Sequence, residues 1–429
     1  MSRVLLATLG SLGDLHPLIA LGLELRRRGH SVWFCTSASY RPRIEALGFE
    51  FHPLRPDITP ENPAMAPVIK AIMEPKRGVE RLLREFVLPE LRATYDDLLS
   101  AVAANGGADL LVCGELVYPA PLVAEKTGVR WATYVTAPMS FFSAYDLPVL
   151  PPAQKLSIFL RRFGPGVSRM LIALIKRTTR SWSEPVRRLR AELGLGPGQD
   201  PVFEGRYSPQ LVLAIFSPEL SGPQPDWPAN TVITGFPFYD GANQESSLPP
   251  ELTRFLAAGD RPIVFTLGSA AVVDPGTFYE ESAKAARPLK RRAILLVGKN
   301  APPPALPPEV VAFDYVRFSE LFPKVAAVVH QGGIGTTGQA LLAGRPMLVM
   351  PYNYDQPDNA ARMVRLGVGR SIARKQYSAE RVARELTELL TDSRYELAAQ
   401  RIGERMQGER GVETGCNALE KLLGSPRGG

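Results

Sequence analysis

Cysteine is scarce in this chain of 429 residues, which contains three. Cys35, Cys113 and Cys416 lie far apart, with no C-x-x-C pair and no histidine nearby at metal-ligand spacing. A disulfide framework and a structural zinc site both need cysteines grouped in such patterns. The sequence therefore argues against both.

Long apolar runs are also missing. The nearest candidate, residues 170–175, is far shorter than the roughly 20 residues that a membrane-spanning helix needs. An apolar run surrounds Arg3, but Asp14 and His16 interrupt it before a signal peptide would be complete. We therefore predict a first β-strand here, no membrane span, and a cytoplasmic location.

Acidic pairs of the form Asp-x-Asp do not occur anywhere in the chain. A metal-assisted phosphate site would use such paired carboxylates as ligands. We therefore predict no metal site and no cofactor, so that a bound diphosphate would be stabilised by protein donors alone.

Acidic residues are slightly outnumbered, since 50 Lys and Arg against 43 Asp and Glu give a net charge of +7. The basic residues are scattered, apart from a run between Arg161 and Arg190. This distribution argues against a nucleic-acid partner. The positive charge instead favours anionic substrates or an anionic lipid surface.

The order of apolar runs and glycine turns predicts an α/β protein. Residues 4–8 and 31–36 read as strands, and residues 17–28 between them read as a helix, which makes a βαβ unit. The same alternation continues through the chain, so we predict parallel sheets covered by helices. The further expected elements are residues 110–113, 120–127, 130–135, 262–268, 293–297, 326–329 and 346–350.

Chain length and composition predict two domains. Residues 234–247 are rich in Gly, Pro, Asn and Ser, as an interdomain connection is. We predict an N-terminal domain over 1–241, a C-terminal domain over 242–400, and a final helical segment over 401–429. Both domains would be doubly wound parallel sheets that face each other across a cleft.

The most informative segment spans residues 328–363 and reads VVHQGGIGTTGQALLAGRPMLVMPYNYDQPDNAARM. A strand-like run ends in a histidine, and a glycine-rich turn then leads into a helix. Free backbone N–H groups and a helix N-terminus together attract phosphate, although the same turn with a structural histidine would look alike. The candidate phosphate-binding residues are His330, Gly332, Gly333, Gly335 and Thr336.

Asp355 and Gln356 follow the next strand, at the sheet edge where ligands of open α/β folds bind. A carboxylate beside an amide suits the neighbouring hydroxyls of a sugar. A phosphate site next to a sugar site indicates a nucleotide sugar. Asp358 or Asn359, slightly later, would cap the helix that follows.

This order of residues (His, Gly-Gly, Gly-Thr, Gly-x-Pro, then Asp-Gln and Asn) resembles the donor-binding motif of the family 1 glycosyltransferases. That group has the two-domain GT-B fold and includes plant UDP-glycosyltransferases and sterol and antibiotic glycosyltransferases. The resemblance extends over nearly the whole chain. DWP at 226–228, TGFPFYDG at 234–241 and the HQGGIG form are most similar to the rhamnosyltransferases of rhamnolipid synthesis.

The resemblance implies a donor site for UDP- or dTDP-sugars. The pyrophosphate would lie on His330, Gly335 and Thr336, and the transferred sugar on Asp355 and Gln356. The implied base contacts are stacking on Tyr315 and hydrogen bonds to the backbone of Val316, and Ser269 would reach the phosphates.

Three positions depart from the family pattern. Arg317 and Phe318 replace the usual Pro-Gln or Pro-His, and Gly338 stands where plant members have a ribose-binding glutamate. These departures concern the base and the ribose, and they leave the phosphate site intact.

The N-terminal loop LGSLGDLHP, residues 9–17, resembles the family signature in which the residue after the second glycine is the general base. Here that residue is Asp14, and the resemblance implies inversion at the anomeric carbon. From the residues alone, Asp14 is instead an N-cap of the helix at Pro17. His16 is the second candidate base. Plant members orient their base from a later loop, which corresponds to Gly114, next to Glu115.

Aromatic and apolar side chains in residues 138–145 and 159–182 predict an apolar small-molecule acceptor of phenolic, sterol or polyketide type, bound by the N-terminal domain. Each of these aromatics taken singly is better explained by core and helix packing. In residues 161–180, basic residues flank an apolar face. That pattern predicts weak membrane-surface association, or else a solvated basic face.

Three alternative functions share this architecture. One is a dTDP-rhamnose-dependent rhamnosyltransferase acting on hydroxy-fatty-acid lipids, and another is a nucleotide-sugar 2-epimerase, which needs no acceptor base. The third is an inactive donor-binding partner subunit, against which the intact Asp14, Asp355 and Gln356 argue.

Overall fold

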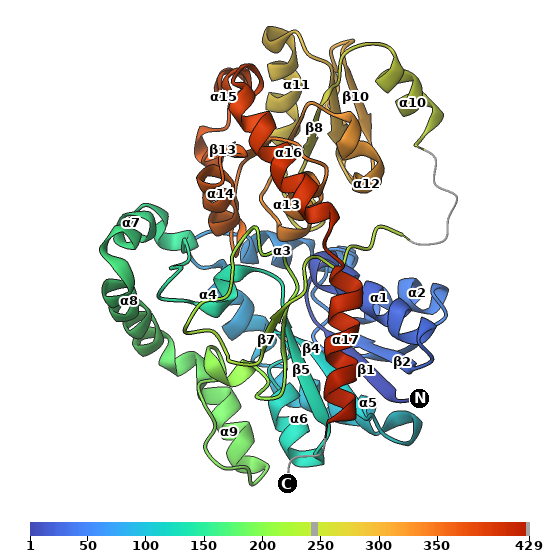
Figure 1. The fold of residues 1–429 in the computed structure, drawn as a ribbon, viewed down its shortest axis with the longest axis vertical. Coiled ribbons are helices and arrows are strands. Elements are labelled where there is room, and N and C mark those ends of the chain that lie inside the picture. Colours follow the sequence, from blue (N-terminus) through green and yellow to red (C-terminus); the bar gives the residue numbers. More distant parts are fainter. Residues whose placement is uncertain (242–247, 426–429) are drawn as a thin grey trace.

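The computed structural model describes residues 1–241 and 248–425, and the expected domain boundary at 242 therefore falls outside the described residues. Two parallel sheets, with helices packed around each, form the two halves of the molecule (Figure 1). The predicted fold class is confirmed. The first sheet has the order β3-β2-β1-β4-β5-β6-β7 and the second has the order β10-β9-β8-β11-β12-β13.

The strands of the first sheet are β1 (Arg3–Thr8), β2 (Ser31–Thr36), β3 (Glu50–Pro53), β4 (Leu110–Gly114), β5 (Arg130–Val135), β6 (Val212–Ala214) and β7 (Thr231–Ile233). Those of the second sheet are β8 (Ile263–Thr266), β9 (Ala293–Leu296), β10 (Val310–Phe313), β11 (Ala327–His330), β12 (Met347–Val349) and β13 (Gly369–Ser371). Most are almost fully buried, which is why they read as continuous apolar runs.

The helices of the first half are α1 (Leu12–Arg27), α2 (Arg41–Ala46), α3 (Ala66–Ile72), α4 (Gly78–Arg81), α5 (Leu91–Ala103), α6 (Ala120–Thr127), α7 (Gln154–Leu160), α8 (Gly164–Thr179) and α9 (Glu184–Glu192). Those that follow are α10 (Pro250–Ala257), α11 (Phe278–Leu289), α12 (Phe318–Leu321), α13 (Ile334–Leu342), α14 (Gln356–Arg365), α15 (Ala379–Thr391), α16 (Ser393–Gln407) and α17 (Gly411–Gly424). None of the helices in the described ranges is long and apolar enough to cross a membrane.

The strand order reverses once in each sheet. β1 pairs with β2 on one side and β4 on the other, and β8 pairs in the same way with β9 and β11. Loops that leave neighbouring strands in opposite directions open a crevice at the carboxyl edge, where ligands of such folds bind. Each half therefore has one such crevice.

Apolar side chains pack between the halves. Phe216 and Trp227 of the first half share a buried cluster with Val264 and Val328 of the second. The C-terminal helix α17 lies against α1 (Figure 1), where Cys416 Sγ contacts Leu21 O at 3.6 Å. The chain thus returns to the first half after completing the second sheet.

Candidate functional site

Asp14 stands in the first crevice, in the first turn of α1. Ser11 is the N-cap, and its backbone N donates to Asp14 Oδ2 at 2.9 Å while its Oγ lies 3.3 Å from the same oxygen. The prediction of a helix starting at Pro17 with Asp14 as its N-cap is wrong, because this capping box starts the helix at Leu12. Capping fixes the carboxylate at the carboxyl end of β1.

Gly10 makes room for this carboxylate. Its φ is +127°, and a Cβ on Gly10 would lie 2.4 Å from Asp14 Oδ2. We expect Gly10→Ala to cost about 1–3 kcal/mol of stability and to lower kcat by displacing Asp14. Gly29→Ala is the control, because Gly29 has φ +88° with nothing within 4 Å of its Cβ position. Equal kcat values in the two variants, measured beside denaturant melts, would contradict this role.

Two other acidic side chains interact electrostatically with the Asp14 carboxyl: Glu115 of the first half and Asp355 of the second. Burial raises the pKa of Asp14 to about 6, and the charge of Glu115, at the end of β4, adds to the rise. Burial also raises the pKa of Asp355 to about 7, and the charge of Asp14 adds to that rise. Asp14 and Asp355 therefore lie within electrostatic reach of each other between the two sheets.

Glu115 is already engaged by other residues. Its carboxylate accepts from Ser140 Oγ at 2.9 Å and lies 3.3 Å from Arg206 NH1. The neighbouring Gly114 has no space for a side chain, because its Cβ would lie 2.7 Å from Tyr134 Oη. Glu115 thus acts on Asp14 through its charge, while its own hydrogen bond and ion pair are with Ser140 and Arg206.

His16 lies two residues beyond Asp14 in a different environment. Its ring makes an edge contact with Tyr239, with centroids 5.3 Å apart, and its Nε2 is buried without a hydrogen-bond partner among the described residues. Burial lowers the pKa of His16 to about 4, helped by the charge of Arg43. The imidazole is therefore neutral at physiological pH.

His330 ends β11 and is completely buried. Its Nδ1 accepts a hydrogen bond from Gly332 N at 3.0 Å, so the neutral ring carries its proton on Nε2. Burial lowers the pKa of His330 to about 3, which keeps the ring neutral. Nε2 is buried and has no partner in the described part of the chain. A buried donor left in this state suits an anionic ligand.

The glycine turn after His330 leads directly into α13. Gly333 is the N-cap in extended conformation, and the helix begins at Ile334, so Gly335 and Thr336 lie in its first turn. Gly332 has φ +88°, and a Cβ there would lie 2.8 Å from Val349 Cγ1. The Gly332 N–H is taken by His330, whereas the first N–H groups of α13 have no partner within the helix and follow His330 closely in the chain.

Asp355 and Gln356 are tied to that turn. Asn359 Nδ2 donates to Asp355 Oδ2 at 2.7 Å and to Gly332 O at 2.9 Å. Gln356 Oε1 accepts from Tyr352 N at 2.9 Å, which leaves the amide NH₂ as the part of the side chain suited to a ligand. Asn359 thus joins the predicted phosphate and sugar sites, rather than capping α14 as expected.

Gln331, which follows His330 in the motif, is a further residue of the site that the sequence did not predict. Its Nε2 lies 2.3 Å from the Cβ position of Gly268 and 2.6 Å from that of Gly333. The amide therefore fills the space between the turn after β8, which precedes Ser269, and the glycine turn. Its position beside the histidine was the only signal in the sequence.

Tyr315 and Val316 lie on the opposite side of β8 from β11, after β10. Tyr315 is 61% exposed, whereas Val316 has its side chain in the core, so a ligand would meet the Val316 backbone. Tyr315 lies within electrostatic reach of Asp240 and Arg43, the two charged groups that also act on His16. The predicted base site and His16 therefore face the same region.

Gly338, where plant members carry glutamate, packs against an aromatic ring. A Cβ on Gly338 would lie 2.9–3.0 Å from three ring atoms of Phe236, which stacks on Phe238. The ring takes the space that a longer side chain would need.

We expect Gly338→Ala to destabilise the protein by about 1–3 kcal/mol, because its added methyl overpacks the Phe236 ring. Gly335→Ala, three residues earlier on α13 with nothing within 4 Å of its Cβ position, should instead be neutral or stabilising. Urea unfolding of both variants checks this. A stabilised Gly338→Ala would contradict the packing argument.

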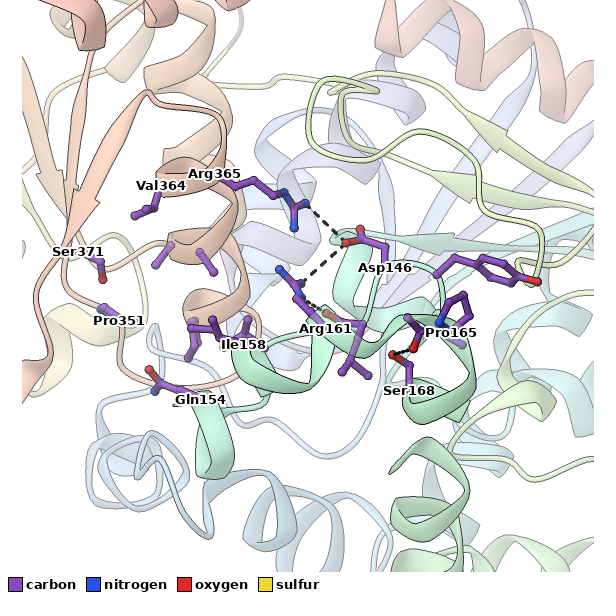
Figure 2. A pocket seen from close by; sticks show the side chains of 18 residues that line it. Asp146, Gln154, Ile158, Arg161, Pro165, Ser168, Pro351, Val364, Arg365 and Ser371 are labelled. Carbon is purple, nitrogen blue, oxygen red and sulfur yellow. Dashed lines mark hydrogen bonds and ion pairs between the residues drawn. The ribbon is translucent and has the colours of Figure 1, made fainter. Parts of the chain in front are cut away.

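A cavity of about 560 Å³ lies between the halves, lined mainly by residues of the segment 144–149, the start of α8 and α14, with Ile158 of α7 at its wall (Figure 2). Beside it, Asp358 accepts from Val149 N at 2.8 Å and lies 2.7 Å from Arg362 Nε. Asp358 is therefore a buried link between the halves, and its predicted capping role is wrong. Phe141, predicted to contact the acceptor, stacks on Trp227 in the core, with centroids 4.1 Å apart.

Comparisons with known proteins agree with this geometry. Residues 4–95 match the glycosyltransferase family 28 N-terminal domain, and residues 295–413 match the erythromycin biosynthesis protein CIII-like C-terminal domain. O-mycaminosyltylonolide 6-deoxyallosyltransferase of Streptomyces fradiae is 33% identical over 98% of this chain and 97% of its own length. A sterol 3-beta-glucosyltransferase of Neurospora crassa is 28% identical over 98% of the chain, which spans 27% of that relative.

Solved structures show the same fold at low sequence identity. The calicheamicin glycosyltransferase CalG4 aligns with a TM-score of 0.72 at 18% identity, over 99% of this chain and 98% of its own. The spinosyn rhamnosyltransferase SpnG complexed with thymidine diphosphate aligns at 0.69 and 17% identity, over 97% and 100%. Together with the relatives of similar sequence, these matches show that the chain is an enzyme of the family 1 glycosyltransferases, with the GT-B fold.

Proposed function

We propose that this glycosyltransferase moves a hexose from a UDP- or dTDP-sugar to a hydroxyl of an apolar small molecule, with inversion and without a metal ion. The observation that carries the proposal is the pair of acids from the two halves. Asp14 lies at the crevice of the first sheet, and Asp355 lies beside the glycine turn of the second half. The charge of Asp14 adds to the rise in the pKa of Asp355. An acceptor held near Asp14 would then meet a sugar held near Asp355.

The reaction is a single displacement. The acceptor oxygen attacks the anomeric carbon while the bond from that carbon to the diphosphate oxygen breaks, and the acceptor proton passes to the Asp14 carboxylate. Attack opposite the leaving group inverts the anomeric centre. Asp14 is suited to this step because its raised pKa of about 6 makes it a better base than an exposed aspartate, while it stays ionised at neutral pH.

The leaving diphosphate needs donors that are already in position. His330 Nε2–H is buried and without a protein partner in the described ranges, and the N-terminus of α13 adds backbone N–H groups beside it. Such preorganised donors stabilise developing negative charge. We therefore expect product formation to continue in EDTA.

The activities of similar proteins support the proposed substrate classes. The O-mycaminosyltylonolide 6-deoxyallosyltransferase and a sterol 3-beta-glucosyltransferase are among the relatives of similar sequence, and one structural neighbour was solved with thymidine diphosphate. The acceptor that we propose is an apolar alcohol of phenolic, sterol or polyketide type, and the sterol relative supports the sterol class.

The test is product analysis by mass spectrometry. UDP-glucose, UDP-galactose and dTDP-rhamnose are each offered with phenolic, sterol, macrolide and hydroxy-fatty-acid acceptors, with and without EDTA. A β-linked glycoside formed from an α-linked donor supports the proposal. A rhamnosylated fatty acid would favour the rhamnolipid alternative, free epimerised nucleotide sugar would favour the epimerase, and donor binding without any product would favour an inactive subunit.

A further inference from the structure

The segment that contains α7 and α8 has large apolar side chains that are exposed and do not pack in the protein core. Of the eleven large apolar side chains exposed in the described ranges, six lie between residues 156 and 174, and they are 47–73% exposed. We call these six the apolar face. They are Leu156, Ile158, Phe159, Phe163, Met170 and Leu174.

The inner side of α8 shows why these residues are not core. Among its described residues, Ser168 and Ile172 are buried, and Ile172 packs in a small cluster with Ala144 and Leu147. Met170 and Leu174 lie on other sides of the helix and are 73% and 56% exposed. The helices form an outer edge of the first half, near its border with the second (Figure 1). Exposed apolar side chains that gather in one short segment are typical of an interaction site.

Charge in this segment has one sign. Residues 151–183 contain seven Lys or Arg and no Asp or Glu. Three of the seven have protein partners: Arg161 pairs with Asp358, Lys176 with Glu204, and Arg169 donates to Tyr145. The other four make no side-chain hydrogen bond or ion pair with described residues, and they are Lys155, Arg162, Arg177 and Arg180.

The interdomain cavity adjoins this face. Ile158 belongs to the apolar face and also lines the cavity, together with Pro165 at the start of α8 and Val364 of α14 (Figure 2). A hydrocarbon chain that entered beside Ile158 would find a mainly apolar lining.

We propose that the apolar face docks on an anionic lipid surface, together with the four basic residues near it in the chain that lack a described partner (Lys155, Arg162, Arg177 and Arg180). Apolar side chains enter the boundary between headgroups and acyl chains, while Lys and Arg beside them attract anionic headgroups. A second copy of the chain fits less well, because it would bring the same positive charge against this one. The proposal concerns membrane binding alone and does not depend on the transferase reaction.

The test is flotation of the full-length protein with phosphatidylglycerol–phosphatidylcholine vesicles and with pure phosphatidylcholine vesicles. We expect binding to the anionic vesicles that weakens as salt is raised. Removing two charges in Arg162→Gln/Arg177→Gln should lower the partition coefficient roughly 25-fold. Removing apolar contacts in Phe159→Ser/Met170→Ser should lower it by roughly tenfold or more.

The matched control is Leu397→Ser/Arg401→Gln on α16, which removes one exposed apolar and one exposed basic residue elsewhere. It should bind vesicles like the parent, with circular dichroism confirming that all variants are folded. No flotation, equal binding to both vesicle types, or an equal loss in the control would overturn the proposal. Self-association that the two face variants abolish, without vesicle binding, would also overturn it and assign the face to a protein interface.

Discussion

Asp14→Asn should lower kcat by about 10²–10⁴-fold while leaving nucleotide binding unchanged. The asparagine oxygen can still accept the hydrogen bond from Ser11 N, so the start of α1 is preserved. What the variant loses is the ability to take a proton from the acceptor hydroxyl. Single-turnover product formation and calorimetric titration of UDP and dTDP measure the two quantities separately.

The Ser11→Ala variant distinguishes the role of Asp14 as a base from its role in capping α1. It removes the side-chain bonds of Ser11 to Gly13 N and Asp14 Oδ2, at a cost of about 0.5–2 kcal/mol of stability, and it retains the carboxylate. We expect a small loss of kcat from this variant. If Ser11→Ala lost as much activity as Asp14→Asn, Asp14 would be a structural cap and not a base.

The pH dependence gives a second signature of Asp14. Its carboxyl must be ionised to accept a proton, so kcat/KM should rise with pH through about 6 in the parent and lose this limb in Asp14→Asn. Stability should move in the opposite direction. The folded-state pKa is raised from 3.8 to about 6, so the native state binds the proton more tightly, and stability falls as pH rises through that window.

This stability penalty at neutral pH is on the order of 3 kcal/mol for a shift of that size. Asp14→Asn removes the buried charge, and it should therefore unfold at an equal or higher denaturant concentration than the parent at pH 8. An inactive variant that is also markedly less stable at pH 8 would contradict both parts of the argument.

The sequence predicts the long, buried elements well, because their apolar runs are continuous. Residues 31–36, 120–127 and 130–135 are confirmed as β2, α6 and β5 with the same bounds. The three-residue strands β6, β7 and β13 were not predicted. β13 consists of Gly, Arg and Ser, and its pairing with β12 comes from its place in the sheet and not from its composition.

Within the site too, the residues of a local motif are predictable from the sequence, and the contacts between distant residues are not. The sequence predicts His330, the glycines and Asp355 as site residues because the motif that contains them is local in the chain. Asn359, which ties the turn to Asp355, was expected as a cap, because its partner Gly332 lies 27 residues away. Ser11 and Asp14, three residues apart, have the spacing of a capping box. The predicted helix starts later, at residue 17, because proline is common at the first position of a helix.

One part of the buried charge cluster between the halves could be predicted from the sequence. Asp358 and Arg362 are spaced i and i+4 on α14, as a helical ion pair is. Their partner Asp146 lies 216 residues before Arg362 and contacts it at 2.5 Å. No pattern in a single sequence pairs residues so far apart, since the contact exists only once the two halves have packed together.

His330→Asn should lower kcat by about 10²–10³-fold and weaken the binding of UDP and dTDP. An asparagine oxygen can replace Nδ1 as the acceptor for Gly332 N, so the glycine turn should persist. No group of asparagine reaches the position of Nε2, and the buried donor is lost.

His330→Gln is the matched variant, because its longer side chain can bring an N–H group near the Nε2 position while it gives up the contact with Gly332 N. If His330 acts through its Nε2–H on the diphosphate, the glutamine variant should keep more activity and tighter nucleotide binding than the asparagine variant, even where it is the less stable of the two. If His330 instead serves to hold the turn, the order should reverse, with asparagine the more active. Calorimetric Kd values for both nucleotides, set beside urea unfolding of both variants, distinguish the two roles because they require opposite rankings.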